Sequence, residues 1–234
     1  MDAVKLALVG VVLLLAGGAA VASGVLPADE AGAIAERVWP ILLFVVAVTI
    51  VAELSATAGV FDVVAARLAR WSRGRIVTLW LLIVGFAVVV TAFLSLDTTA
   101  VLLTPVVVAV ARANGLPPLP FAFTTVWLAN TASLFLPVSN LTNLLAAHRL
   151  DEGGVPVPFL ALLGPSALVA VAATVLLLWT WHRRALSGRF AIGAPPRVAD
   201  AVLLRGSAVV LIVLLPLLVS GMPPWLPALA AAAA

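Results

Sequence analysis

The chain reads Phe93-Leu94-Ser95-Leu96-Asp97-Thr98-Thr99-Ala100-Val101-Leu102-Leu103-Thr104-Pro105 near its middle, where one carboxylate and several hydroxyl groups separate two long apolar runs. A charged side chain is costly in hydrocarbon, so one that is kept there usually has a function. Backbone that leaves the helical conformation at membrane depth must line protein or a water-filled cavity. The stretch therefore predicts a transport site inside a membrane.

The composition of the chain agrees with a membrane protein. Of its 234 residues, 64% are hydrophobic and 10% are charged, whereas soluble domains carry about 25% charged residues. The mean hydropathy is +1.25, and several apolar runs approach the ~20 residues that span a bilayer. We predict an all-α polytopic membrane protein, with the lipid bilayer as its first partner.

Charge and cysteine content exclude several function classes. The net charge is +3, but the arginines fall in short segments between apolar runs, as membrane topology requires, so no nucleic-acid partner is expected. The chain has no Cys, which excludes disulfides, thiolate metal sites and a Cys nucleophile. Because the apolar runs show no Ser–His, metal–His or paired-carboxylate arrangement, we expect no enzyme, no metal and no cofactor beyond a coupling proton or Na⁺.

Apolar runs and turn residues predict the order of the elements. Residues 27–37 are expected to form an outside loop. Residues 61–75 are expected to form an amphipathic helix on the inner membrane surface, with Phe61, Leu68 and Trp71 on its apolar face. Full spans are expected over residues 4–26, 38–60, 159–181 and 202–219, with a hairpin over 76–112 and a broken helix over 120–150.

The two arms of the predicted hairpin have unequal lengths. At 1.5 Å per residue, the runs 76–94 and 100–112 are roughly 28 Å and 20 Å long. The second run is too short to cross a hydrocarbon core of ~30 Å comfortably. We therefore favour a re-entrant hairpin, which enters from the cytoplasm and turns near the midplane, over two full crossings.

The positions of the basic residues predict the orientation, because cytoplasmic loops carry an excess of Lys and Arg. This rule places the N-terminus in the cytoplasm of a multi-pass protein of the cell (plasma or inner) membrane. Only Arg37 and Arg149 fall outside. The residues placed inside are Lys5, Arg67, Arg70, Arg73, Arg75, Arg112, Arg183, Arg184, Arg189, Arg197 and Arg205.

A second polar cluster lies within the apolar segment 120–150. It reads Asn130-Thr131-Ala132-Ser133, and then Pro137-Val138-Ser139-Asn140-Leu141-Thr142-Asn143. Pro137 cannot donate a backbone hydrogen bond and clashes with the preceding turn. We predict a discontinuous helix that is broken near Pro137 to Asn140, with backbone groups free for a ligand or ion.

The two polar motifs together resemble the ion transporter superfamily, and most closely its arsenite/antimonite efflux permeases and their citrate-transporter-like relatives. The resemblance implies two inverted repeats, each with a re-entrant hairpin and a broken helix that hold the substrate between them. On this basis residues 1–184 form the first repeat. Residues 185–234 supply a cytoplasmic loop, a linking span and the start of a second repeat. We expect a truncated chain, the N-terminal half of a longer transporter whose second half completes it; a half-size protein that pairs as a homodimer is the alternative.

Asp97 is the central candidate of the hairpin motif. One interpretation makes it only an N-cap for the following helix, because Asp side chains accept the free N–H groups of a first turn. We favour Asp97 as a proton or cation site, with Ser95, Thr98 and Thr99 contacting the substrate. Glu53, in the inner half of the second span, is either a proton relay or an interfacial carboxylate.

In the broken helix the candidate residues carry amides and hydroxyls, which can bind a solute or simply join helices. The absence of arginine from the predicted site favours a small neutral hydroxide such as arsenous acid, or a cation, over a polycarboxylate. The candidates are Asn130, Ser133, Ser139, Asn140 and Asn143.

The leading functional hypothesis is secondary efflux of arsenite or antimonite, coupled to protons or to the membrane potential. A second hypothesis is cation/proton antiport or the transport of a carboxylate such as citrate. A third, of another class, is a scaffold or inert membrane fragment.

Overall fold

The computed structural model describes residues 3–154, 157–193 and 200–234, with the side chains of residues 3–7 and of Arg37 left out. Lys5, Arg37 and Arg197, which were used to predict the orientation, therefore lie outside the described side chains. The described residues form helices and no strand, apart from an isolated bridge between Arg75 and Arg189. They divide into two compact units, residues 1–43 and 44–234. The all-α prediction is confirmed.

The first unit contains helix α1 (Ala3–Ala22) and the beginning of α2 (Ala28–Thr57). The prediction of a loop over residues 27–37 is wrong, because α2 begins ten residues before the expected start of the second span. This segment is rich in alanine, a strong helix former. Asp29 and Glu30 lie in its first turn, where their negative charge stabilises the positive end of the helix dipole.

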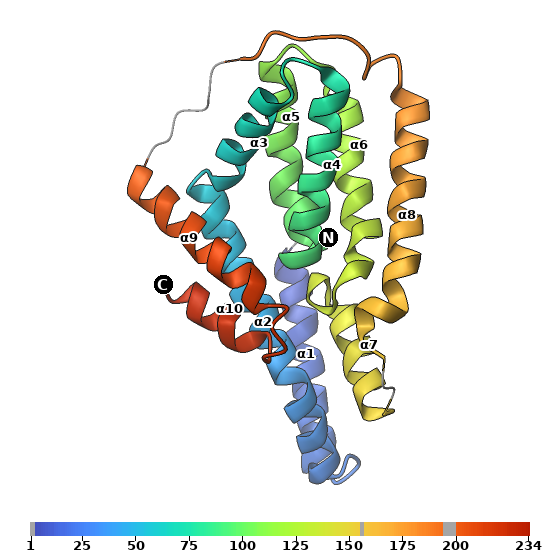
Figure 1. Cartoon of the computed structure of the whole chain (residues 1–234). Helices are drawn as coiled ribbons and strands as arrows, with labels where there is room; N and C mark the ends of the chain where they lie inside the picture. The colour runs from blue at the N-terminus through green and yellow to red at the C-terminus, as the bar shows by residue number, and fades with distance from the viewer. Residues whose placement is uncertain (1–2, 155–156, 194–199) are drawn as a thin grey trace. The chain divides into compact units, whose positions relative to one another are not determined.

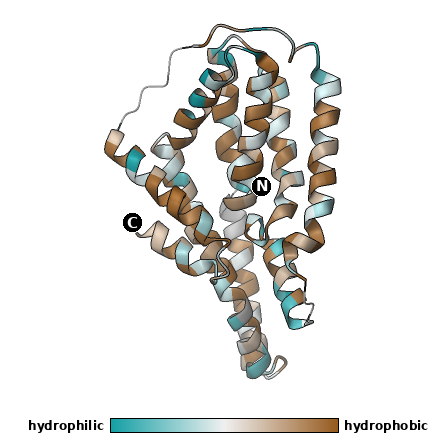
Figure 2. Ribbon diagram, in the orientation of Figure 1, coloured by the Kyte–Doolittle hydropathy of each residue, from teal (hydrophilic) through white to brown (hydrophobic). Residues whose placement is uncertain are grey.

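The second unit begins at Phe44, within α2, and contains the remaining helices (Figure 1). Among the described helices, α2, α4 and α8 are long and apolar enough to cross a membrane, and Figure 2 shows α4 and α8 as mainly hydrophobic. The polytopic membrane class is confirmed. After α2, the described helices of the second unit are α3 (Val60–Trp71), α4 (Ile76–Phe93), η1 (Thr98–Leu103), α5 (Thr104–Ala113), α6 (Pro118–Thr131), η2 (Ala132–Phe135), η3 (Pro137–Ser139), α7 (Leu141–Glu152), α8 (Phe159–His182), α9 (Ala201–Leu217) and α10 (Trp225–Ala232).

Helix α3 matches the predicted amphipathic segment, and its apolar residues divide between a buried stripe and an exposed side. Phe61, Ala65 and Leu68 are buried, whereas Trp71 is 62% exposed. Ten residues separate Trp71 from Phe61, which at 3.6 residues per turn rotates the indole away from the buried stripe. The guanidinium of Arg67 lies 6.0 Å from the centre of the Trp71 ring, within the range of a cation–π contact. The buried stripe packs against α4 and α5.

Helices α4, α5 and α6 form the core of the second unit and lie side by side in Figure 1. The side chains at their contacts are apolar and almost fully buried, as close packing in protein interiors requires. They include Leu79, Ile83, Leu103, Val107, Phe121 and Leu128. This packing also positions the two polar motifs. The hairpin motif follows α4 and the second motif follows α6, and both lie at the same end of α4.

The C-terminal part contains α9, close to the predicted span over residues 202–219. The Asp200 carboxylate caps α9 by accepting hydrogen bonds from the backbone N–H groups of Val202 and Leu203 (2.8 and 3.0 Å). Helix α10 was not predicted. It packs against α9, and it begins at Trp225 after two prolines, which are favoured at helix starts because their fixed φ suits the first turn.

Candidate functional site

The hairpin turns at Ser95, between the end of α4 and the π-helix η1. Ser95 has a φ of 153°, a backbone conformation that is costly for a residue with a side chain. Its Oγ accepts a hydrogen bond from the backbone N–H of Thr98 (3.0 Å) and shares another with the Thr98 hydroxyl (2.9 Å). Ser95 therefore satisfies a free N–H group at the start of η1.

Asp97 makes no capping hydrogen bond, although it is the residue directly before η1. The interpretation of Asp97 as an N-cap is therefore wrong, because Ser95 already occupies that role. The Asp97 side chain is exposed, whereas Thr98 and Thr99 beside it are buried. The turn thus presents one carboxylate that local structure does not use.

The π-helix that follows is tied to both of its neighbours by threonines. The Thr99 hydroxyl shares a 2.8 Å hydrogen bond with the hydroxyl of Thr91 on α4. The Thr104 hydroxyl donates to the Thr99 carbonyl (3.1 Å) and to the Thr125 hydroxyl on α6 (2.9 Å). Single-turn π segments inside helices are frequent at functional sites. Here the threonines hold the widened turn in place.

The second motif forms a break between α6 and α7. Helical geometry gives way to two short 3₁₀ turns, and Leu136 and Asn140 are extended. The break includes the predicted positions Pro137 to Asn140 and begins earlier, at Ala132. Asn140 caps α7, because its Oδ1 accepts from the backbone N–H of Asn143 (2.8 Å).

The remaining polar residues of the break stabilise its own backbone. The Asn143 amide donates to the carbonyls of Ser133 (2.7 Å) and Leu136 (3.2 Å). The Ser139 hydroxyl donates to the same two carbonyls. Ser133, Ser139 and Asn143 are all buried. Their side chains therefore supply partners that the interrupted helix lost, as buried carbonyls require.

The structure brings the two motifs to neighbouring positions. Helix α4, which leads into the hairpin turn, packs against η2 and η3 of the break, and η1 packs against α6. Asn130, at the end of α6, is exposed like Asp97, and its amide donates to the Val126 carbonyl (3.2 Å). Asn140 and Ser95 are partly exposed. These four side chains are the accessible part of the candidate site.

Glu53 is exposed near the end of α2. In the part of the chain that the structure describes, no hydrogen bond joins it to the hairpin turn or the helix break. The described residues also contain no cluster of three or more His, Asp or Glu that could hold a metal ion. The arrangement can offer a carboxylate, hydroxyls and amides to a small solute.

Sequence reasoning missed the threonines that hold the hairpin against α6. Besides the Thr104–Thr125 contact, the Trp80 indole N–H donates to the Thr124 hydroxyl (2.7 Å). Trp80, Thr124 and Thr125 are almost completely buried. A signal was present, because two adjacent threonines inside an apolar helix mark a face that another helix must satisfy.

Comparison with known proteins places these features in context. The sequence profile of CitMHS, a family described as "Citrate transporter", matches residues 3–234. No solved structure matches the chain.

Three curated relatives share the printed name "Arsenical pump membrane protein". The protein of Yersinia enterocolitica is 30% identical over 205 residues, which cover 84% of this chain and 47% of the relative. That of Escherichia coli K12 is 29% identical over 188 residues, covering 78% and 43%. Another from Escherichia coli is 30% identical over 203 residues, covering 84% and 47%. The chain thus spans about half the length of the curated relatives it matches.

Proposed function

Since this chain belongs to the CitMHS citrate transporter family, we propose that it is part of a secondary transporter that exports arsenite or antimonite across the cell membrane. The name that the relatives share, arsenical pump membrane protein, supports this choice of substrate. Transport then uses binding and conformational change rather than an enzymatic step, and is coupled to protons, Na⁺ or the membrane potential.

The observation that carries the proposal is the accessible Asp97 carboxylate at a hairpin turn, next to a broken helix. The turn does not need this carboxylate as a cap. A carboxylate in a membrane protein without a structural partner is a functional candidate. We assign Asp97 to the coupling proton or cation, and Ser95, Asn130 and Asn140 to contacts with the solute.

The chemistry of the motifs suits a small neutral hydroxide. Hydroxyl and amide groups can donate to and accept from the hydroxyls of arsenous acid. The chain has no Cys, so it cannot hold As(III) through sulfur. Weak polar contacts also release the solute readily, which a transport cycle requires.

We propose the orientation that the basic residues predicted, with the N-terminus in the cytoplasm and helix α4, η1 and α5 as a re-entrant hairpin. Residues 1–184 then form the first repeat, and α9 is a linking span. The exposure of Asp97 and Asn130 supports a site that a second transporter half completes, either from the same protein or from a second copy.

Transport of a carboxylate is the second candidate, because the family description names citrate. Against it, residues 93–105 and 130–143 contain no Arg or Lys to clamp a polycarboxylate. The two candidates predict different substrates in the same cells.

The test uses the full-length gene in a host that is sensitive to arsenite. We expect its expression to lower arsenite accumulation, and Asp97→Asn to abolish that effect while Asp151→Asn, in the exposed last turn of α7, preserves it. Unchanged accumulation with verified expression would contradict arsenite export. Uptake of labelled citrate into membrane vesicles would then establish the carboxylate alternative.

A further inference from the structure

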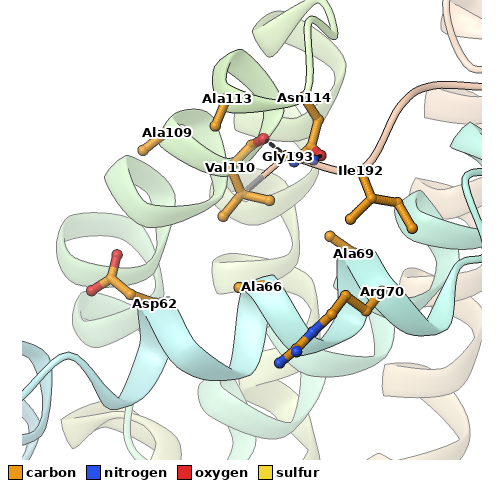
Figure 3. Close-up of a pocket in the computed structure, with 10 residues that line it drawn as sticks. All are labelled: Asp62, Ala66, Ala69, Arg70, Ala109, Val110, Ala113, Asn114, Ile192 and Gly193. Atoms are coloured by element: carbon orange, nitrogen blue, oxygen red, sulfur yellow. Dashed lines mark hydrogen bonds between the residues drawn. The ribbon is translucent and has the colours of Figure 1, made fainter. Parts of the chain in front are cut away.

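A cavity of about 150 Å³ lies between α3, α5 and the segment after α8. It adjoins the last turn of α5, so it is separated from the hairpin turn by the length of that helix. Figure 3 shows the residues that line it. They are Asp62, Ala66, Ala69, Arg70, Ala109, Val110, Ala113, Asn114, Ile192 and Gly193.

Small side chains create this space. Two alanines of α3 and two of α5 line it, and a methyl group cannot fill the gap between two helices. The segment after α8 closes one side, where the Gly193 N–H donates to the Asn114 Oδ1 (2.7 Å). A Cβ atom at Gly193 would lie 2.9 Å from the Ala113 carbonyl oxygen, so only glycine fits this wall without a shift.

Asp62 is a partly buried carboxylate in this cavity. In Figure 3 its side chain points toward α5, whereas the Arg70 side chain points away from α5. Within the described part of the chain, Asp62 forms no ion pair, and the interaction found for its carboxylate is with its own backbone N–H. Partial desolvation of an unpaired carboxylate favours its protonated form, whereas the position of Asp62 in the first turn of α3 favours the charged form.

The electrostatic surroundings agree with this geometry. Burial raises the pKa of the Asp62 carboxyl above its ordinary value of 3.8, and the smaller effect of the backbone hydrogen bond lowers it. Helix α4 has no charged residue. Among the described residues that line the cavity, Arg70 of α3 is the one charged side chain besides Asp62. The charged residues on α3 and on the described segments around it are Arg67 and Arg70 on α3, Arg73 and Arg75 between α3 and α4, Arg112 on α5, Arg183, Arg184 and Arg189 after α8, Asp200 at the N-cap of α9, and Arg205 on α9.

We propose that this cavity is a proton-binding site, separate from Asp97, in which the Asp62 carboxylate takes up one proton and becomes a neutral carboxylic acid. The cavity volume of about 150 Å³ is large enough to hold several waters beside the carboxyl. The inference does not depend on the transported substrate, because it rests on the cavity and its unpaired carboxylate.

The test is chemical labelling of the full chain in detergent with dicyclohexylcarbodiimide, a hydrophobic reagent that modifies protonated carboxyls. Mass spectrometry of peptides follows the labelling between about pH 5 and about pH 8. We expect labelling of Asp62 to persist to higher pH than that of the exposed Asp29 and Asp151 in the same sample. Equal midpoints for the three residues would overturn the proposal, and this comparison needs no variant.

A matched pair of variants tests the role of charge. Ala66→Lys places an ammonium one turn after Asp62 on the same face of α3, where Asp–Lys pairs form, and is expected to reduce Asp62 labelling at least several-fold. Ala66→Met adds similar bulk without charge and is expected to preserve it. Equal labelling of the two variants, or protection of Asp62 in wild type by Na⁺ at constant pH, would overturn a proton site.

Discussion

The backbone N–H of Thr98 donates a 3.0 Å hydrogen bond to the Oγ of Ser95, and this contact closes the hairpin turn. It also explains why the nearby Asp97 carboxylate does not cap the helix. Because Ser95 provides the cap, Asp97 has no local hydrogen bond to make and stays exposed. The capping side chain and the carboxylate without a capping contact therefore lie two positions apart in one turn.

Ser95→Ala removes this cap and is expected to destabilise the fold. Loss of a capping hydroxyl costs about 0.5–2 kcal/mol, and thermal unfolding in detergent measures it. The control is Ser187→Ala, whose exposed hydroxyl bonds only to the Arg184 carbonyl. An equal effect of the two substitutions would show that the Ser95 contact does not hold the turn.

Asp97→Asn is expected to separate transport from stability. The carboxylate is exposed and forms no capping contact, so the free energy of unfolding should change by less than about 0.5 kcal/mol. Arsenite accumulation in cells and thermal unfolding of the purified variant measure the two quantities. A loss of stability as large as that of Ser95→Ala would assign Asp97 a structural role.

Asn143→Ala is expected to weaken the helix break. Its amide donates to the Ser133 carbonyl and to the partly buried Leu136 carbonyl. The Ser139 hydroxyl remains as a donor to both, so the expected cost is that of the lost hydrogen bonds, about 0.5–1.5 kcal/mol each. The measurement is again thermal unfolding. Thr142→Ala, at an exposed neighbouring position, is the control. If both variants unfold at the same temperature, the amide is dispensable for the break and available to a solute.

Sequence alone predicted the hairpin turn and the helix break because each follows from a local physical conflict. An aspartate inside an apolar run and a proline inside a helix both change the backbone near their own positions. The assignment of the cap to Ser95 rather than Asp97 was not predictable, because both side chains can cap a helix. Only the backbone geometry distinguishes them.

Tertiary contacts account for the other differences. The Thr104–Thr125 hydrogen bond joins residues of two helices, so it depends on how these helices pack. Likewise, the sequence predicted that Ser133 and Asn143 contact a ligand. In the structure they serve the backbone of the break. The first turns of α2 were misassigned because their charges hid an alanine-rich helix.

Asp62→Asn tests the partly buried carboxyl by the pH dependence of stability. Asp62 lies on α3, outside the candidate membrane spans. Because its pKa is higher in the folded chain than its ordinary value, the folded state binds more protons than the unfolded state between the two pKa values. Stability therefore falls as the pH rises through this window.

The asparagine variant cannot ionise, so we expect it to lose this pH-dependent fall and to unfold at a higher temperature than wild type above the window. Thermal unfolding from about pH 4 to about pH 8 measures the difference between the two curves. Asp151→Asn, at an exposed position in the last turn of helix α7, should leave the wild-type curve unchanged. Parallel curves for Asp62→Asn and wild type would mean that the cavity does not raise the pKa of the carboxyl.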